Sequence, residues 1–457
     1  MPSLTRRLCE FGTDFTLSSA SGVEIRKAKL LLLDLIGVAL AGLETEEAEK
    51  AFRACQALNL GGGGASSLWG TGARAPAGIA ALFNGIAAHA LELDDFLGID
   101  HTGAVVIPAL LAVADQEAEL EGEQLLEGLI FGYEIGKRLI DAAGGYQQHN
   151  KDGWHTTGTL GPFAAAAAVG KFLNLPVNQL TSALGLAGSF TGGTWAFNED
   201  GAMSKRYHCG IAAQVGIQAC YLAKQGFTGP EQVLEAKRGG YFNLYGQGIT
   251  EKVKSLADHM GCDLRINLAG IKPYACCRGI HSSLDVVLGF KGTHGLTSDE
   301  LQEIVVKCTD FQKAQLGKTV PTSRIEAQLS LSYSLAVAIK FGEASYPYFT
   351  VAHISDPELV EIARKIKLVV QTGRPLGNEP EVSIRKKDGS SFTGTQPVPL
   401  GDPLNPVSES AIRKKFGNLS KRQLPDKTRH RLEKLVLHVE RDGNLLRVKN
   451  ILGEEWG

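Results

Sequence analysis

The chain has 457 residues, 44% of them hydrophobic and 21% charged, the balance of an ordinary soluble globular protein with ample length for a buried core. That balance excludes an intrinsically disordered chain. Basic and acidic residues number 47 and 49, a formal net charge of −2, so the basic excess expected of a nucleic-acid-binding protein is missing.

Small and apolar residues at helical spacing fill the first 260 residues. Only short turns separate these segments, without convincing alternating strands, and we therefore expect one large helical domain. The spacing predicts helices over 24–43, 76–95, 106–120, 124–142, 156–173 and 208–225.

The pattern changes near residue 265. β-branched residues alternate over 303–311, 365–373 and 380–394, which predicts strands, and helical patterns lie between them at 324–342 and 355–366. Helical periodicity then returns near the end of the chain. The expected fold is mainly α, a large all-helical domain interrupted by an inserted α+β domain. The expected boundaries are helical residues 1–265, an α+β domain over 266–400 and a helical return over 401–457.

The sequence carries no sign of a membrane span, a secretion signal or a cofactor loop. Asp34 interrupts the longest apolar run, 30–43, which is shorter than the about 20 residues of a membrane span. Residues 70–75 fit the loose dinucleotide pattern GxGxx[GA], but the acidic partner, Glu92, falls on a predicted helix instead of a strand. The eight cysteines form no CxxC pair, so reduced thiols are expected. We expect a cytoplasmic protein without a cofactor, nucleic acid or membrane contact.

Four polar clusters interrupt otherwise apolar surroundings, and most of them directly precede an apolar helix. Histidines, hydroxyls and cations at helix starts suit an anionic ligand. If these starts converge, several basic groups in one cavity favour a substrate with several carboxylates, because a lysine about 4 Å from a carboxylate contributes about 4 kcal/mol at an effective dielectric near 20. The clusters are His89-Ala-Leu-Glu92-Leu-Asp94-Asp95 with Asp100-His101-Thr102, Gly153-Trp-His155-Thr156-Thr157-Gly158, Ser204-Lys205-Arg206-Tyr207-His208, and Lys272-Pro-Tyr274-Ala-Cys-Cys-Arg278-Gly-Ile-His281.

Each cluster also has a purely structural interpretation. The acids of the first cluster can be helix caps and surface charges, although a helix would place His89, Glu92 and Asp95 on nearly one face. The histidines at helix starts can cap those helices. The basic pair of the third cluster can be solvated, and the cations of the fourth can stabilise a hinge between domains.

In this order the four clusters resemble the MmgE/PrpD family, which includes 2-methylcitrate dehydratase, cis-aconitate decarboxylase and iminodisuccinate epimerase. The resemblance covers nearly the whole chain. The family's HAxDxDD motif matches 89–95, with Glu92 in place of the usual Asp, and its HPS-type motif falls at 101–103 without the Pro and Ser. The GxHxTG motif at 153–158 is typical of the decarboxylase and epimerase branch. KxxH and KPYxxCR motifs match 205–208 and 272–278.

The resemblance implies a set of site residues and a lid role for the α+β domain. Phe96 stands where the decarboxylase has a pocket Thr, and a pocket Tyr has no clear match near Val320, so we expect a pocket reshaped for a smaller or more apolar acid. The implied catalytic residues are His101, His155, Lys205 and Lys272. The implied substrate-binding residues are Glu92, Asp95, Thr102, Thr156, Arg278 and His281, with no metal.

The chemistry implied by the family is a carbanion or enediolate formed beside a carboxylate without a cofactor. Lys205, Lys272 and His155 would stabilise the oxyanion, and His101 would move the proton because an imidazole titrates near neutral pH. The expected function is a cofactor-independent lyase on a small di- or tricarboxylate, either decarboxylase-like or dehydratase-like, acting as a homodimer.

Three other functions remain open. A racemase or epimerase of a dicarboxylate would use the same carbanion with a base on each face. A metal-dependent hydrolase would use Asp94, Asp95, His101 and His155, and would lose activity in EDTA. A catalytically inactive protein would bind carboxylates through Lys205 and Lys272 without turnover.

Overall fold

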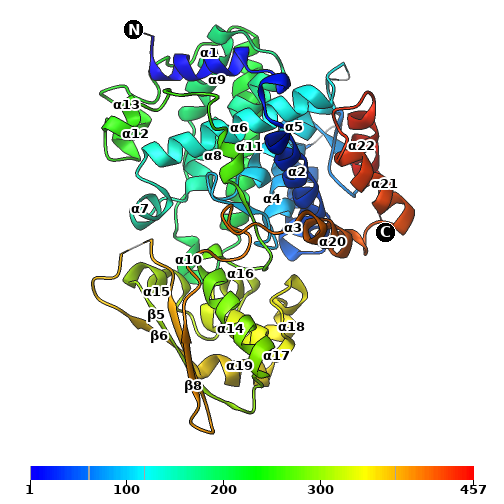
Figure 1. Cartoon of the computed structure of the whole chain (residues 1–457). Coiled ribbons are helices and arrows are strands. Elements are labelled where there is room, and N and C mark those ends of the chain that lie inside the picture. Colours follow the sequence, from blue (N-terminus) through cyan, green and yellow to red (C-terminus); the bar gives the residue numbers. More distant parts are fainter. Residues whose placement is uncertain (1, 60–61, 118, 376, 457) are drawn as a thin grey trace.

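The structure, a computed structural model, describes residues 2–59, 62–117, 119–375 and 377–456. Figure 1 shows a large helical part and, beside it, a smaller unit that contains a β-sheet, with the last helices returning to the large part. The large part comprises α1 (Leu4–Asp14), α2 (Gly22–Gly42), α3 (Glu46–Leu58), α4 (Ala77–His89), α5 (Thr102–Ala114), α6 (Gly122–Ala142), α7 (Tyr146–Lys151), α8 (Thr156–Phe172), α9 (Val177–Gly188), α10 (Phe197–Asp200), α11 (Ser204–Lys224), α12 (Tyr241–Leu244), α13 (Glu251–Lys254), α20 (Glu409–Ser420), α21 (Asp426–Val436) and α22 (Asn444–Leu452).

Helix α8 forms the centre of the helical core. All of its residues are buried, and it packs against α5, α6 and α11. Its alanines and glycines allow this close packing: a Cβ added at Gly161 would lie 2.7 Å from the Ala212 Cβ, and one added at Gly216 would lie 2.4 Å from the Ala165 Cβ. The polar first turns of α5, α8 and α11 are therefore held at fixed positions by a tightly packed interior.

The smaller unit is an α+β layer structure. Its sheet has the strand order β6-β5-β7-β8, with β5 and β6 parallel and the other pairs antiparallel. Helices α14 and α17 pack together, and α14 also contacts β7. The unit comprises α14 (His281–His294), β5 (Leu301–Cys308), α15 (Asp310–Leu316), α16 (Arg324–Gln328), α17 (Leu331–Phe341), α18 (Val351–Ile354), α19 (Pro357–Arg364), β6 (Ile366–Val370), β7 (Glu381–Lys386) and β8 (Ser391–Gly394).

A short antiparallel pair ties the first polar cluster to the entrance of the smaller unit. Strand β3 (Asp95–Phe96) pairs with β4 (Gly270–Ile271). Gly270 is required there, because an added Cβ would lie 2.3 Å from the Phe96 Cζ. The pair places the 90–101 loop beside Lys272. A second small pair, β1 (Ser66–Ser67) with β2 (Arg74–Ala75), lies away from this region of the chain.

The predicted helices over 24–43, 124–142 and 156–173 are confirmed to within about two residues. Strands form in all three predicted regions, but β5 and β6 end three residues before the predicted ends, and 380–394 forms two strands, β7 and β8. The helix predicted over 76–95 is wrong in its last six residues, because α4 ends at His89 and Glu92 has a φ of 53°. His89, Glu92 and Asp95 therefore do not share a helix face. The region 324–342 forms two helices, α16 and α17.

In the part of the chain that the structure describes, no helix combines the length and the apolar character needed to span a membrane. The mainly α fold is confirmed.

Candidate active site

The starts of three core helices meet at the end of α4. His101 is the N-cap residue of α5, His155 is the N-cap residue of α8, and Lys205 lies in the first turn of α11. Neither imidazole caps its helix by a hydrogen bond, so the capping interpretation is wrong for both. The centroid of the His101 ring lies 3.9 Å from that of the His89 ring and 6.1 Å from that of the His155 ring.

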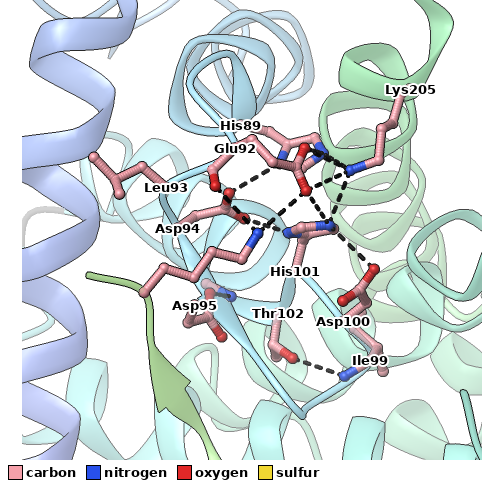
Figure 2. Close-up of polar contacts among 12 residues, drawn as sticks. His89, Glu92, Leu93, Asp94, Asp95, Ile99, Asp100, His101, Thr102 and Lys205 are labelled. Carbon is pink, nitrogen blue, oxygen red and sulfur yellow. Dashed lines mark hydrogen bonds and ion pairs between the residues drawn. The ribbon is translucent and has the colours of Figure 1, made fainter. Parts of the chain in front are cut away.

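Glu92 is the common partner of three buried cations. Its carboxylate accepts hydrogen bonds from the Lys205 Nζ at 2.6 and 2.8 Å (Figure 2), and also from the Lys272 Nζ at 3.1 Å and from the Arg206 guanidinium. All four side chains are at most 2% exposed, so Lys205 and Arg206 are not solvated surface charges. Burial alone would raise the pKa of Glu92, but the three cations hold it well below its ordinary value. Glu92 is therefore a permanent anion.

Asp94 orients two histidines at once. One oxygen lies 3.0 Å from the His89 Nδ1 and the other 2.8 Å from the His101 Nδ1. Burial would raise the pKa of Asp94, but the two imidazoles lower it well below its ordinary value. An ionised Asp94 accepts hydrogen bonds only, so each ring carries a proton on Nδ1 and presents Nε2 to the interior of the site.

The two rings differ in charge. Burial and the neighbouring His101 lower the pKa of His89 well below its ordinary value, so His89 is neutral. Burial also acts to lower the pKa of His101, but the carboxylates of Asp100 and Asp94 outweigh it and raise the pKa. The His101 Nε2 lies 3.1 Å from the Asp100 Oδ2 and 3.2 Å from the Lys205 Nζ (Figure 2).

His155 is held by a second imidazole. Its Nδ1 lies 2.8 Å from the His208 Nδ1, and burial together with nearby cationic and imidazole groups lowers the pKa of both rings, that of His208 to about 4. Both rings are neutral. The His155 Nε2 is buried without a hydrogen-bond partner among the described residues and lies 4.0 Å from the Asp100 Oδ2. The Trp195 ring packs edge-on against His155, with centroids 5.4 Å apart.

A cavity of about 500 Å³ opens beside this cluster, between the helical part and the α+β unit. Three cations and three carboxylates line it, so its charges are balanced. Lys205, Lys272 and Arg278 face Glu92, Asp100 and Glu379. The other lining residues are Phe96, Leu97, Gly98, Gly144, Gly145, Tyr146, Gln147, Gln148, Trp195, Cys277, Gly279, Phe311, Gln312, Gln315, Leu329, Gly377 and Asn378.

Four of the residues predicted for the site line the cavity: Glu92, Lys205, Lys272 and Arg278. Arg278 pairs with Glu379, and its guanidinium lies 5.6 Å from the centre of the Phe96 ring.

The other six predicted residues lie behind the cavity wall. His101 and His155 lie next to Asp100, which lines the cavity. The remaining four were predicted to bind substrate, but three of them form hydrogen bonds within the protein and one has no polar contact among the described residues. Asp95 accepts hydrogen bonds from the Tyr133 hydroxyl and the Gly103 amide, both at 2.8 Å. The Thr102 hydroxyl accepts from the Ile99 amide at 2.9 Å, and the His281 Nε2 donates to the Cys276 carbonyl at 3.2 Å. The Thr156 hydroxyl is buried without a partner among the described residues.

Sequence reasoning missed several cavity residues. Asp100 was weighed only as a cap or a surface charge. Tyr146 and Gln147 come from α7, a helix too short to show a periodic pattern, and Trp195 and Gln315 lie outside the polar clusters. In the sequence, the adjacent Gly144 and Gly145 were the one signal of a turn at this place. In the structure their φ angles are 97° and 89°, and the chain turns sharply before α7.

Among the described residues, two groups of side chains have donor atoms close enough together for a metal ion: His89, Asp94 and His101, and Asp100, His101 and His155. The ammonium of Lys205 lies 3.2 Å from the Nε2 atoms of both His89 and His101. This ammonium would repel a divalent cation at either place. These residues therefore do not fit a metal centre.

Comparisons with known proteins match this architecture. The sequence model of the MmgE/PrpD N-terminal domain matches residues 6–251, and that of the MmgE/PrpD C-terminal domain matches residues 274–441. The chain is 27% identical to the cis-aconitate decarboxylase of Mus musculus over 435 residues, 91% of this chain and 86% of the relative. It is also 27% identical to the enzyme of that name from Aspergillus terreus, over 96% of this chain and 93% of the relative, and to that from Homo sapiens, over 91% and 87%. The chain belongs to the MmgE/PrpD family.

Proposed function

We propose that this protein is a cofactor-independent lyase that forms a carbanion beside a carboxylate of a small di- or tricarboxylic acid, by decarboxylation or dehydration. The relatives named cis-aconitate decarboxylase support the reaction class. The observation that carries the proposal is the placement of Lys205 and Lys272 in the cavity wall, with the Asp94–His101 pair directly behind them.

The two lysines bind and stabilise the oxyanion. Both ammonium groups are buried and lie within 3.1 Å of Glu92, which fixes their positions before a substrate arrives. Burial lowers the pKa of Lys272, but Glu92 outweighs it and raises the pKa, so this lysine remains charged throughout turnover. Fixed cations in a site shielded from water stabilise developing negative charge without reorganisation.

His101 holds the proton that the carbanion requires. Its raised pKa keeps the ring protonated near neutral pH, and Asp94 fixes the ring so that Nε2 points toward the cavity side of the cluster. In a decarboxylation this proton replaces the departing CO₂ on carbon. In a dehydration a base first removes the α-proton, which forms the carbanion, and His101 then protonates the leaving hydroxyl so that water departs.

The α+β unit acts as a lid in this proposal. Cys277, Arg278, Phe311 and Gln315 contribute its side of the cavity, and closure over the helical part would exclude water from the carbanion. The β3–β4 pair lies where the lid joins the helical part. We further propose that the protein is a homodimer, as the family resemblance implies.

An epimerase is the second candidate, because it would use the same carbanion. It needs a base on each face of one carbon, and the partner base opposite His101 would be Lys272. The raised pKa of Lys272 works against this role, because the ammonium must first lose its proton. The lyase is therefore the better-supported function.

The test is proton NMR of the purified, EDTA-treated protein with cis-aconitate in heavy water. Itaconate that carries one deuterium establishes decarboxylation with protonation at carbon. Conversion of 2-methylcitrate instead would establish the dehydratase. Exchange of an α-proton in a dicarboxylate without net conversion identifies the epimerase, and the absence of turnover or exchange with any of these acids refutes the proposal.

A further inference from the structure

The histidines of the site are separated from the cavity by a single carboxylate. His101 is 1% exposed, His155 is fully buried, and neither lines the cavity. Asp100 does line it, with a side chain that is 13% exposed. Its Oδ2 lies 3.1 Å from the His101 Nε2 and 4.0 Å from the His155 Nε2. A proton that passes between His101 and a ligand in the cavity has Asp100 in its path.

The other charged groups of the wall are poorly placed to carry that proton. Glu92 accepts hydrogen bonds from three cations, and its pKa is held well below the ordinary value. Lys205 already contacts Glu92, His89 and His101, and Lys272 contacts Glu92.

Arg278, the third cation of the wall, pairs with Glu379 and cannot release a proton in a protein. Within the described part of the chain, the ion-pair contacts of Asp100 are the two imidazoles alone. Among the carboxylates that line the cavity, Asp100 is thus the closest to the His101 Nε2 and the one placed to exchange a proton with it.

The backbone of this loop is strained where the carboxylates enter the wall. Glu92, Leu97 and Asp100 have φ angles of 53°, 68° and 86°, and they are three of the five described non-glycine residues with positive φ. Such conformations are costly and concentrate at functional sites, where the surrounding structure holds a side chain in a required place. At Asp100 the required place is between His101 and the cavity.

We propose that Asp100 is a catalytic residue that carries the proton between His101 and the α-carbon of the substrate. This inference rests on the proposed lyase function. In the decarboxylation, the C–C bond to the departing carboxylate breaks, CO₂ leaves, and the electron pair remains on carbon. The His101 Nε2 gives its proton to the Asp100 carboxylate, and the resulting carboxyl gives that proton to the carbon, so that an O–H bond breaks and a C–H bond forms. His101 then regains a proton from water, a net uptake of one proton per turnover.

Two substitutions of Asp100 separate proton transfer from a merely structural role. Asp100→Asn keeps the shape of the side chain and tolerates positive φ, but it has no proton to give. We expect kcat to fall about 10²-fold or more, within the range for loss of an acid–base group, with little change in KM. Asp100→Gly also tolerates positive φ and leaves a gap beside His101. Asp14→Asn, an exposed substitution on α1, serves as the control and should leave kcat unchanged.

The decisive measurement is rescue of Asp100→Gly by small added acids. Formate and azide fit the gap and differ in basicity, so a proton-transfer role predicts a rise in kcat of about tenfold or more that depends on the basicity of the added anion. The wild type and Asp14→Asn should not respond. Wild-type-like activity of Asp100→Asn, or equal rescue by both anions, would overturn the assignment of Asp100. A wild type that neither converts nor exchanges any carboxylate would overturn the lyase function itself, which distinguishes the two failures.

Discussion

Replacement of Glu92 by Gln should destabilise the protein strongly, although the change removes only one charge. Each of the three cations lies at hydrogen-bonding distance from the carboxylate, and a contact of about 3 Å gives a gross attraction of about 5 kcal/mol at an effective dielectric of about 20. Desolvation offsets most of this sum. Loss of one member of a buried ion pair leaves uncompensated charge and costs about 3–5 kcal/mol.

The expected effect on thermal stability follows from the length of the chain. An unfolding entropy of about 2.1 cal/mol/K per residue over 457 residues gives about 1 kcal/mol/K, so Tm should fall by about 3–5 °C if the chain unfolds as one unit. Differential scanning calorimetry would measure this change. Glu303→Gln is the matched control, because Glu303 also pairs with two cations, Lys367 and Arg385, but these are 63% and 49% exposed. Its Tm should equal that of the wild type.

A second readout tests the charge argument itself. Without the Glu92 carboxylate, a small carboxylate ligand can take its place between Lys205 and Lys272. Tricarballylate should therefore raise the Tm of Glu92→Gln more than that of the wild type. A Tm for Glu92→Gln equal to that of Glu303→Gln would refute the reasoning, as would a ligand response no larger than that of the wild type.

Three further predictions concern the acids around the histidines and the metal question. Asp94→Asn leaves one acceptor oxygen for two imidazole Nδ1–H groups, so one of the two rings should take the wrong tautomer. We expect kcat to fall by about 10³-fold or more with little change in KM, and kinetics that match the wild type would contradict this. Burial raises the pKa of Asp95 to about 7, so between about pH 4 and 7 the native state holds a proton that the unfolded chain has lost. The stability of the wild type therefore falls as pH rises through that window. Asp95→Asn stays neutral, so its Tm relative to the wild type should increase from pH 5 to pH 8, whereas a constant difference would argue against the shift. Dialysis against EDTA should leave turnover unchanged, because the nearby Lys205 ammonium would repel a divalent cation at both places where donor atoms gather, and activity restored by added Zn²⁺ would show this reasoning to be wrong.

The fold could be predicted from the sequence where local pattern and packing agree. The alanine-rich helix over 156–173 and the strands of the α+β unit are of this kind. The helix predicted over 76–95 failed over its last six residues because distant residues shape that segment. Glu92 takes a φ of 53° while its carboxylate contacts Lys205 and Lys272, which lie 113 and 180 residues further along the chain. No local pattern contains those contacts.

The candidate site was predictable in its residue types and only partly in its geometry. Motifs identified the lysines and histidines, and the structure brings them together. Which of them faces the cavity depends on tertiary packing, and so His101 lies behind Asp100 although the sequence gives no sign of it. Asp100 resembles any acidic residue before a helix until its distance from two imidazoles is known.

The carboxylates of the cavity wall balance the buried cations and limit the charge of the ligand that the site can bind. Glu92 stabilises the joint burial of Lys205, Arg206 and Lys272, because an uncompensated ammonium in the interior is far more costly than a paired one. The same carboxylate occupies the position that a substrate carboxylate would otherwise take. With three cations and three carboxylates already balanced in the cavity wall, each further negative charge on a ligand must displace an internal partner or be met by the proton of His101. The longer acidic side chain of Glu92 and the bulk of Phe96 therefore act in the same direction, and for the proposed lyase both predict a preference for an acid with fewer carboxylates or a smaller frame than cis-aconitate.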